Sequence, residues 1–255
     1  MSGNRHIMSC TLNGVDFSGI DEKLYIENIL EVVALSTETD KRPGHGRVLL
    51  NQPAHDTLQI TIRFMIKERD QAARLSIVNA VQDWARAGWL TVNYRPLQQV
   101  YVYPKDFPKV SVWNWTERLD LVFVAYGEAY WQDVAPVSVS GTGSTGTVDI
   151  TPLGTETCYL EAEITPSGAL TSAAITVNGQ TITLSGISVA SGKTVRLYYD
   201  EDHLLCIESD GVSLLGYRTG ESADDLLLIP RQANEITALF NVSCSYTFKA
   251  RGLWR

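Results

Sequence analysis

The sequence predicts a mainly β protein of two domains, with one α-helix in the first domain. One amphipathic segment, Asp70–Ala87, lies within a first half that is otherwise rich in strand-forming patterns. The second half consists of short apolar runs between turn signals, which is typical of a β-sandwich. A Gly/Ser/Thr stretch, Ser138–Thr147, opens the second half and is interpreted as a linker.

The predicted helix carries signals at both ends. Asp70 is a candidate N-cap, because its carboxylate can accept a hydrogen bond from a free amide of the first turn. Gly88 is a candidate for the left-handed position that ends a helix. Apolar residues recur at helical spacing between them and predict the buried face. These residues are Leu75, Val78, Val81 and Ala85, with Ile77 and Trp84 on the flank.

The strand predictions rest on alternation and on turn chemistry. Thr57–Ile66 alternates apolar and polar residues, as a half-buried antiparallel strand does. Asn13-Gly14 and Asn178-Gly179 each predict a tight hairpin, because this dipeptide supplies the two positive φ angles that such a turn requires. Further strands are expected at Leu24–Leu35, Trp89–Arg95, Val100–Tyr103, Val110–Trp115, Arg118–Tyr126, Cys158–Thr165, Val195–Tyr199, Leu204–Glu208 and Glu235–Phe248.

The domain boundary is expected near the start of the Gly/Ser/Thr stretch. The first domain is predicted to cover residues 1–134, with the helix at 70–87 and a long loop at 36–56. That loop begins polar and charged and holds two prolines and two glycines, and a loop of this length in a compact domain is usually functional. The second domain is predicted at 135–255, and its final strands are allowed to pack back on the first.

Composition narrows the classes of function. The chain has 255 residues, 44% hydrophobic and 20% charged, so it can bury a core. A net charge of −8, most of it in the second half, argues against a general nucleic-acid binder, which would carry a basic face. The N-terminus lacks an apolar stretch long enough for a signal peptide, and no run approaches a membrane span. We therefore expect synthesis and folding in a cytoplasm.

Neither a metal nor a cofactor is expected. The four cysteines, Cys10, Cys158, Cys206 and Cys244, are far apart and form no C-x-x-C pair, so they are interpreted as reduced thiols rather than zinc ligands. The acidic run Asp200–Asp202 with Asp210 has oxygen ligands suited to calcium. A solvated turn between strands is the favoured interpretation, because the spacing of a calcium loop is absent.

No set of catalytic residues stands out, so the chain is not expected to be an enzyme. The four histidines lie on terminal or polar segments, and none belongs to a nucleophile elbow or an H-E-x-x-H motif. They are His6, His45, His55 and His203. Gly44-His-Gly46 lacks the spacing of a phosphate-binding loop.

Two groups of side chains suggest binding instead of catalysis. Tyr101 and Tyr103, with Trp113 and Trp115, alternate at strand spacing and therefore share sheet faces. They fit either a sugar-stacking platform or, as we favour, packing in a core or interface. The basic residues of the long loop, Lys41, Arg42 and Arg47, are too few for a duplex-binding face and fit a contact between subunits equally well.

The order of elements resembles that of the distal tail proteins of long-tailed, siphovirus-type bacteriophages. The resemblance covers nearly the whole chain and rests on no short motif. In the first half it rests on the loop 36–56, the strand Thr57–Ile66, the helix Asp70–Ala87, and the strand Arg118–Tyr126 leading into Gly127–Trp131. In the second half it rests on Ala174–Leu184, Leu204–Glu208 and Leu228–Ile236.

This resemblance implies a structural part of a phage tail tip or baseplate. The first domain would form a ring, usually hexameric, and the second would be a galectin-like β-sandwich that docks other baseplate parts. Implied partners are further copies of the chain, the tail tube protein, the tail hub or tip protein and receptor-binding proteins, with phage DNA passing through the ring channel. The implied location is the virion.

The loop that would belt onto the neighbouring subunit corresponds to residues 36–56. The implied oligomer interface residues are Lys41, Arg42, Pro43, Gly44, His45, Gly46 and Arg47. The alternative function is a carbohydrate-binding β-sandwich module, against which the scarcity of tryptophan in the second half counts, since Trp254 is alone there.

Overall fold

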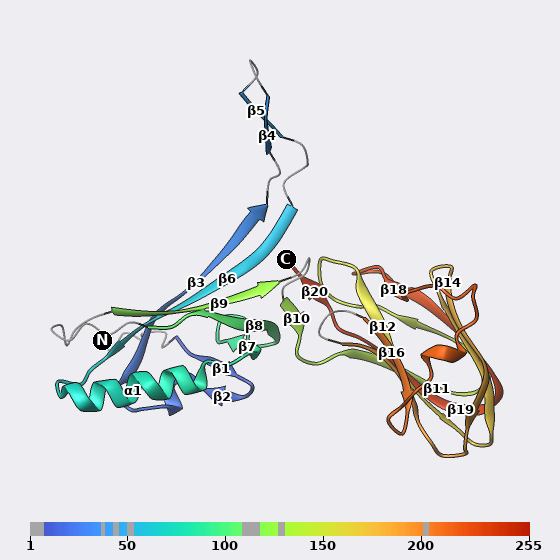
Figure 1. Ribbon diagram of the computed structural model, residues 1–255. Coiled ribbons are helices and arrows are strands. Elements are labelled where there is room, and N and C mark those ends of the chain that lie inside the picture. The colour runs from blue at the N-terminus through green and yellow to red at the C-terminus, as the bar shows by residue number, and fades with distance from the viewer. Residues whose placement is uncertain are drawn as a thin grey trace, which may run out of the picture. The chain divides into compact units, whose positions relative to one another are not determined.

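The computed structural model describes residues 8–36, 39–42, 46–49, 54–108, 118–126, 131–200 and 204–255. The chain divides into two compact units, Met1–Trp131 and Gln132–Arg255. Both units consist mainly of antiparallel strands, and the first also holds the α-helix (Figure 1). The mainly β class predicted from the sequence is confirmed.

Unit 1 is built on one twisted antiparallel sheet in the strand order β2-β1-β7-β8-β9-β6-β3. The turn between β1 and β2 has Asn13 at φ 51° and Gly14 at φ 78°, as the Asn-Gly signal predicted. β8 continues through Pro104, and its register with β9 shifts between Pro104 and Asp106. The strands are β1 (Cys10–Leu12), β2 (Val15–Asp16), β3 (Leu24–Ser36), β6 (Ala54–Ile66), β7 (Gly88–Val92), β8 (Gln98–Asp106) and β9 (Arg118–Tyr126).

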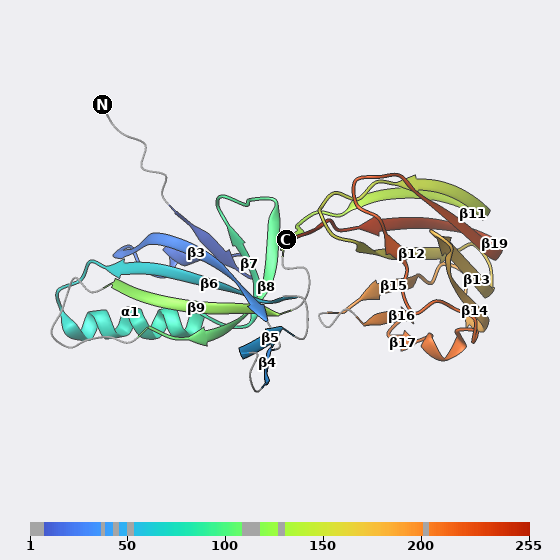
Figure 2. The same cartoon turned by 90° about the horizontal axis from the view of Figure 1, so that it is seen from above.

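The helix α1 (Gln71–Trp84) packs across one face of this sheet (Figure 2). Asp70 is its N-cap, and the Asp70 carboxylate accepts a hydrogen bond of 2.8 Å from the Ala73 amide, as predicted. Aromatic rings connect the helix to its surroundings. The ring centre of Trp84 lies 5.1 Å from that of Phe17, in the 3-10 helix η1 (Phe17–Gly19), and 6.2 Å from that of Phe123 on β9, both in edge-on contacts.

Two details of the predicted helix are wrong. Leu75 is 53% exposed, whereas Arg74 is only 4% exposed, because the stripe that faces the sheet runs through Arg74, Ile77, Val78 and Val81. The helix also ends at Trp84, with Ala85 as its C-cap, and Gly88 instead begins β7.

A contact with a residue far away in the sequence requires glycine at position 88. The side chain of Asn13 occupies the space that a Cβ of Gly88 would need. Asn13 accepts a hydrogen bond of 2.9 Å from the Trp89 amide there, which fixes the first hairpin against β7.

An ion pair between Lys23 and Glu68 lies just before the start of the helix. Lys23 donates to the carboxylate of Glu68, which also accepts from the backbone amides of Arg69 and Asp70 at 2.6 and 3.0 Å. The hydrogen bond from Lys23 and these amides lower the pKa of Glu68 to about 2.

We expect Glu68→Gln to destabilise unit 1 at neutral pH but not at acid pH. A carboxylate with a depressed pKa contributes stability that is complete above about pH 4.5 and is lost as the pH falls toward 2. Urea unfolding followed by tryptophan fluorescence measures this, since every tryptophan except Trp254 lies in residues 1–131. The exposed Glu221→Gln is the control, and a constant difference between the Glu68→Gln and native proteins from pH 7 to pH 2 would contradict the assignment.

Unit 2 is organised around the long strand β19 (Asn234–Ala250). Its first half pairs with β13 and its second half with β12, so one strand joins two sets of strands, β14–β13 and β12–β15–β16–β17. Their inward residues form one apolar core. The remaining strands are β10 (Trp131–Asp133), β11 (Val137–Ile150), β12 (Cys158–Pro166), β13 (Leu170–Val177), β14 (Gln180–Val189), β15 (Val195–Tyr199), β16 (Leu205–Ser209), β17 (Val212–Ser213), β18 (Leu227–Leu228) and β20 (Leu253–Trp254).

The predicted linker Ser138–Thr147 is wrong, because it lies within β11. This 14-residue strand pairs with β19 along its whole length, with a register shift between Gly143 and Thr145. Its glycines have a packing role. The tip of the Tyr246 ring lies where side chains of Gly141 and Gly146 would project. Glycine in this strand therefore makes room for a large neighbour rather than marking a linker.

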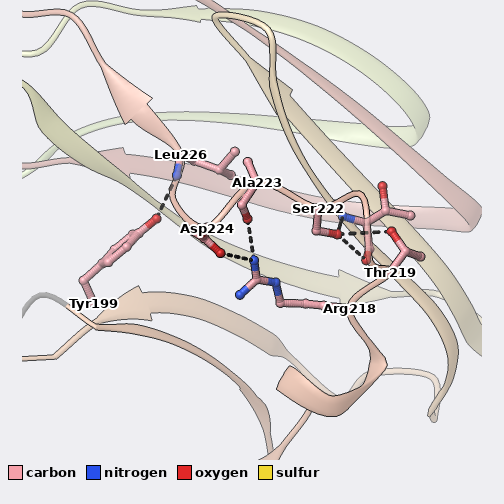
Figure 3. A network of polar contacts seen from close by, with 8 residues as sticks. Tyr199, Arg218, Thr219, Ser222, Ala223, Asp224 and Leu226 are labelled. Carbon is pink, nitrogen blue, oxygen red and sulfur yellow. Dashed lines mark hydrogen bonds and ion pairs between the residues drawn. The ribbon is translucent and has the colours of Figure 1, made fainter.

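The segment that follows β17 forms hydrogen bonds along the edge of β14 (Figure 3). The Thr219 and Ala223 amides donate to the carbonyls of Thr183 and Thr181 at 3.0 and 2.7 Å. Arg218 donates to the Ala223 carbonyl at 2.5 Å. These bonds occupy main-chain groups that an edge strand would otherwise present to other chains.

Tyr199 holds the end of that segment. Its hydroxyl accepts a hydrogen bond of 2.9 Å from the Leu226 amide (Figure 3). Burial raises the pKa of Tyr199, so the phenol stays protonated at neutral pH. In the described part of unit 2, Tyr199 and the polar groups of this segment therefore have a structural role.

Candidate subunit interface

The strand β3 is an unprotected edge of the unit 1 sheet. Among the described strands it pairs only with β6, so its other side presents main-chain donors and acceptors. Three apolar side chains are also exposed along it: Leu30 at 36%, Val32 at 56% and Val33 at 41%. A long apolar edge of this kind is an aggregation hazard unless another chain covers it.

The face of the sheet opposite α1 continues this surface. Leu30 lies opposite Thr61 in the register, and Thr61 lies opposite Val122 on β9. Directly opposed residues share a face. On this outer face the row Leu30, Thr61 and Val122 runs from the β3 edge across β6 to β9, with Thr61 only 8% exposed.

A row of aromatic rings crosses the same outer face. Tyr101 lies 5.1 Å from Trp89 and 5.4 Å from Tyr103, and Tyr103 lies 5.9 Å from Tyr126, as distances between ring centres. Tyr103 is 40% and Tyr126 64% exposed. The first two contacts are edge-on and the third is tilted by 50°, which favours packing over a flat sugar platform. The companion residues Trp113 and Trp115 lie outside the described residues.

Ion pairs hold the strands of this region in register. Arg63 on β6 bonds Asp120 on β9 through two nitrogens at 2.8 and 2.9 Å. The guanidinium of Arg63 lowers the pKa of Asp120, and the carboxylate in turn raises the pKa of Arg63. Arg118 reaches Glu27 on β3 at 2.8 Å. The pairs are partly exposed, so their role is to fix geometry more than to add stability.

The predicted loop 36–56 is partly strand. β3 reaches Ser36, β6 begins at Ala54, and β4 (Thr39–Arg42) and β5 (Gly46–Leu49) form a two-stranded hairpin between them (Figure 1). This polar segment therefore satisfies main-chain groups within its own ladder.

The predicted interface residues lie on this hairpin. Lys41 is directly opposite Arg47, and Arg42 is opposite Gly46. Pro43, Gly44 and His45 lie outside the described residues. Like charges directly opposite each other in a ladder are destabilising.

The other candidate sites do not assemble. His6, His45, His203 and two residues of the acidic run 200–202 lie outside the described residues. Asp210 pairs with Lys193 at 2.8 Å, and Asp200 accepts from the Leu204 amide, which are turn contacts. Within the described ranges no group of three His, Cys, Asp or Glu side chains is placed to hold a metal ion.

The cysteines are free thiols. Cys10, Cys158 and Cys244 are buried and Cys206 is half-buried. Burial raises the pKa of Cys158 to about 12, so this thiol is unreactive at neutral pH. None of the helices in the described part of the chain is long and apolar enough to span a membrane.

Solved structures resemble this chain over nearly its whole length. It matches the Dit protein of phage SPP1, described as a paradigm of the hub adsorption apparatus in phages that infect Gram-positive bacteria, with a TM-score of 0.66. The match covers 96% of this chain and 99% of that chain at 9% identity. The chain has the fold of a phage distal tail protein.

Two structures of the phage p2 baseplate support the same fold assignment. These structures, in the activated conformation with strontium and with calcium, match at TM-scores of 0.53 and 0.51. Each match covers 96% of this chain at 10% identity, and 97% and 98% of the baseplate chains. No family model and no curated protein sequence matches the chain. The resemblance to the distal tail protein fold is thus visible in the backbone rather than in the residues.

Proposed function

We propose that this protein is a structural component of a phage tail tip or baseplate, in which six copies form a ring. The observation that carries the proposal is the match to SPP1 Dit over nearly the full length of both chains. A match that includes both units concerns the whole architecture and not one common β domain.

The surfaces of unit 1 suit a ring. A closed ring uses heterologous contacts, so two different surfaces of each subunit must match. The β3 edge with Val32 and the outer face is one candidate surface, and the hairpin with Lys41, Arg42 and Arg47 is the other. The cationic residues of the hairpin suit an anionic surface on a neighbouring copy.

The role we infer is assembly rather than catalysis. The ring would continue the tail channel through which DNA passes, and would join the tail tube protein to the hub and to receptor-binding proteins. The sandwich of unit 2 would be the docking arm for such baseplate parts. The protein would act in the virion after synthesis in the host cytoplasm.

Light scattering of the full-length protein, with negative-stain images of the same sample, tests the proposal. We expect a mass close to six chains and rings with an open centre. A protein that stays monomeric at every concentration, and that remains so when mixed with the tail tube protein, would contradict ring formation.

Two variants locate the contacts within that ring. Val32→Lys places a charge on the exposed edge strand and is expected to abolish the ring while leaving the melting temperature within about 2 °C, because surface substitutions cost little stability. Deleting residues 38–54 removes the hairpin and is expected to do the same. Leu239→Lys, a 56% exposed position on β19, is the control. Rings that persist in either variant would exclude that surface from the interface.

A further inference from the structure

A polar groove lies on the outer face of the unit 2 sheet. It is a hollow of about 390 Å³ over β12, β15, β16 and β19, and a second hollow of about 360 Å³ adjoins it, with Arg196 and Glu208 lining both. The side chains that line the first hollow are Glu161, Glu163, Arg196, Tyr198, Glu208 and Lys249.

The strand register arranges these side chains in two rows. In the first row Arg196 on β15 lies opposite Glu208 on β16 and Glu163 on β12. In the second row Glu161 lies opposite Lys249 on β19, and Tyr198 lies opposite Cys206. Because the strands form a hydrogen-bonded ladder, each polar group is held at a set position, as binding sites built on strands require.

The charges of the groove nearly balance, because its lining holds three carboxylates and two cations. Lys249 bonds Glu163 at 2.8 Å, and Arg251 lies 3.9 Å from Glu161. Burial raises the pKa of Glu161, so this carboxylate is partly withdrawn from water. Arg196 makes no ion pair within 4.0 Å in the described part of the chain, although glutamates flank it on both neighbouring strands. Its guanidinium keeps donors available for a ligand.

We propose that this groove binds a neutral oligosaccharide. Carboxylates accept hydrogen bonds from sugar hydroxyls, while the guanidinium and ammonium groups donate to hydroxyl and ring oxygens. The Tyr198 ring adds a flat apolar surface with a polar tip, which suits the carbon face of a sugar ring. A nearly balanced set of charges does not select a strongly charged ligand. The inference stands apart from ring assembly and goes beyond the proposed function.

The position of the groove argues against an added peptide strand. Strand addition requires a free sheet edge. β12 has β15 on one side and β19 on the other, and β15 has β12 and β16, so the groove lies on the face of interior strands. The aromatic residue of the groove is a tyrosine, Tyr198.

Calorimetric titration of the full-length protein tests the proposal. The probes are defined neutral oligosaccharides of glucose, galactose, rhamnose and N-acetylglucosamine. We expect at least one of them to bind. Arg196→Ala is expected to weaken that binding by roughly tenfold or more, since a hydrogen bond to a charged group is worth that much. Tyr198→Ala is also expected to weaken it, because the ring surface against the sugar is lost. Tyr217→Ala, at an exposed tyrosine outside the groove, is the matched control and should bind normally.

The outcomes separate this proposal from the ring. Absence of binding to every probe, or equal affinity in the native protein and both groove variants, would overturn the saccharide site. Light scattering of the same variants should give the mass of the native assembly, because the groove lies in unit 2 and the proposed ring surfaces lie in unit 1.

Discussion

Asn234→Leu is expected to destabilise unit 2 by about 3–5 kcal/mol, because it leaves several buried polar groups without partners. Asn234 is 1% exposed, at the start of β19. Leucine is of broadly similar size, so the loss comes from hydrogen bonds and not from a cavity.

The side-chain amide of Asn234 forms hydrogen bonds with three separate parts of the chain. Its nitrogen donates to the carbonyls of Ile150, Ile229 and Gln232 at 3.3, 2.9 and 2.8 Å. Its oxygen accepts from the Ile229 amide and from the Asn178 side chain, both at 2.8 Å. These bonds tie the end of β11, the turn after β18 and the β13–β14 hairpin to one side chain.

Thermal unfolding by circular dichroism and hydrogen exchange of unit 2 amides measure the effect. Asn241→Leu is a close control, because Asn241 also makes three backbone hydrogen bonds, to Thr171, Ser172 and Ala169, but is exposed. Water can replace those bonds, so a cost of about 1 kcal/mol is expected. Equal losses in both variants would show that burial of Asn234 has no special role.

Gly146→Ala is the second substitution with a large expected effect, about 1–3 kcal/mol through overpacking. The new methyl group would collide with the hydroxyl of Tyr246, which is 4% exposed and is flanked by Gly141 in the same way. In a Tyr246→Phe background the hydroxyl is absent, so the same substitution should cost less.

A double-mutant cycle measures this coupling directly. The four proteins are the native chain, the two single variants and the double variant, compared by denaturant unfolding of unit 2. Gly220→Ala is the control, because no atom lies within 4 Å of the place where its new methyl group would project, and it should change stability by less than about 0.5 kcal/mol. Additive losses in the cycle would contradict the role of Tyr246 as the reason for glycine.

Local chemistry was enough to predict the features whose causes lie within a few residues. Asn13-Gly14 and Asn178-Gly179 adopt positive φ angles in hairpins, Asp70 caps the helix, and Thr57–Ile66 alternates as β6 does. Each of these depends on backbone preference or on side-chain period, both of which are written in adjacent positions.

The proposed interface depends on contacts that no local pattern encodes. The long segment 36–56 could be selected from its length and charge. That β3 is an edge follows from the sheet order β9-β6-β3, and that the rings of Trp89, Tyr101 and Tyr126 form one row follows from pairing among β7, β8 and β9. Pairing of distant strands sets which apolar residues remain uncovered.

Glycine shows most clearly what the sequence by itself determined and what only the tertiary structure decided. β11 does alternate, with Val137, Val139 and Val148 inward and hydroxyl residues outward, a signal that its glycines obscured. Gly146 and Gly88 are glycine because Tyr246 and Asn13, far away in the chain, occupy the space of a side chain. Backbone preferences therefore settled the turns, caps and strands, whereas close approach between distant residues decided where glycine permits packing instead of ending structure.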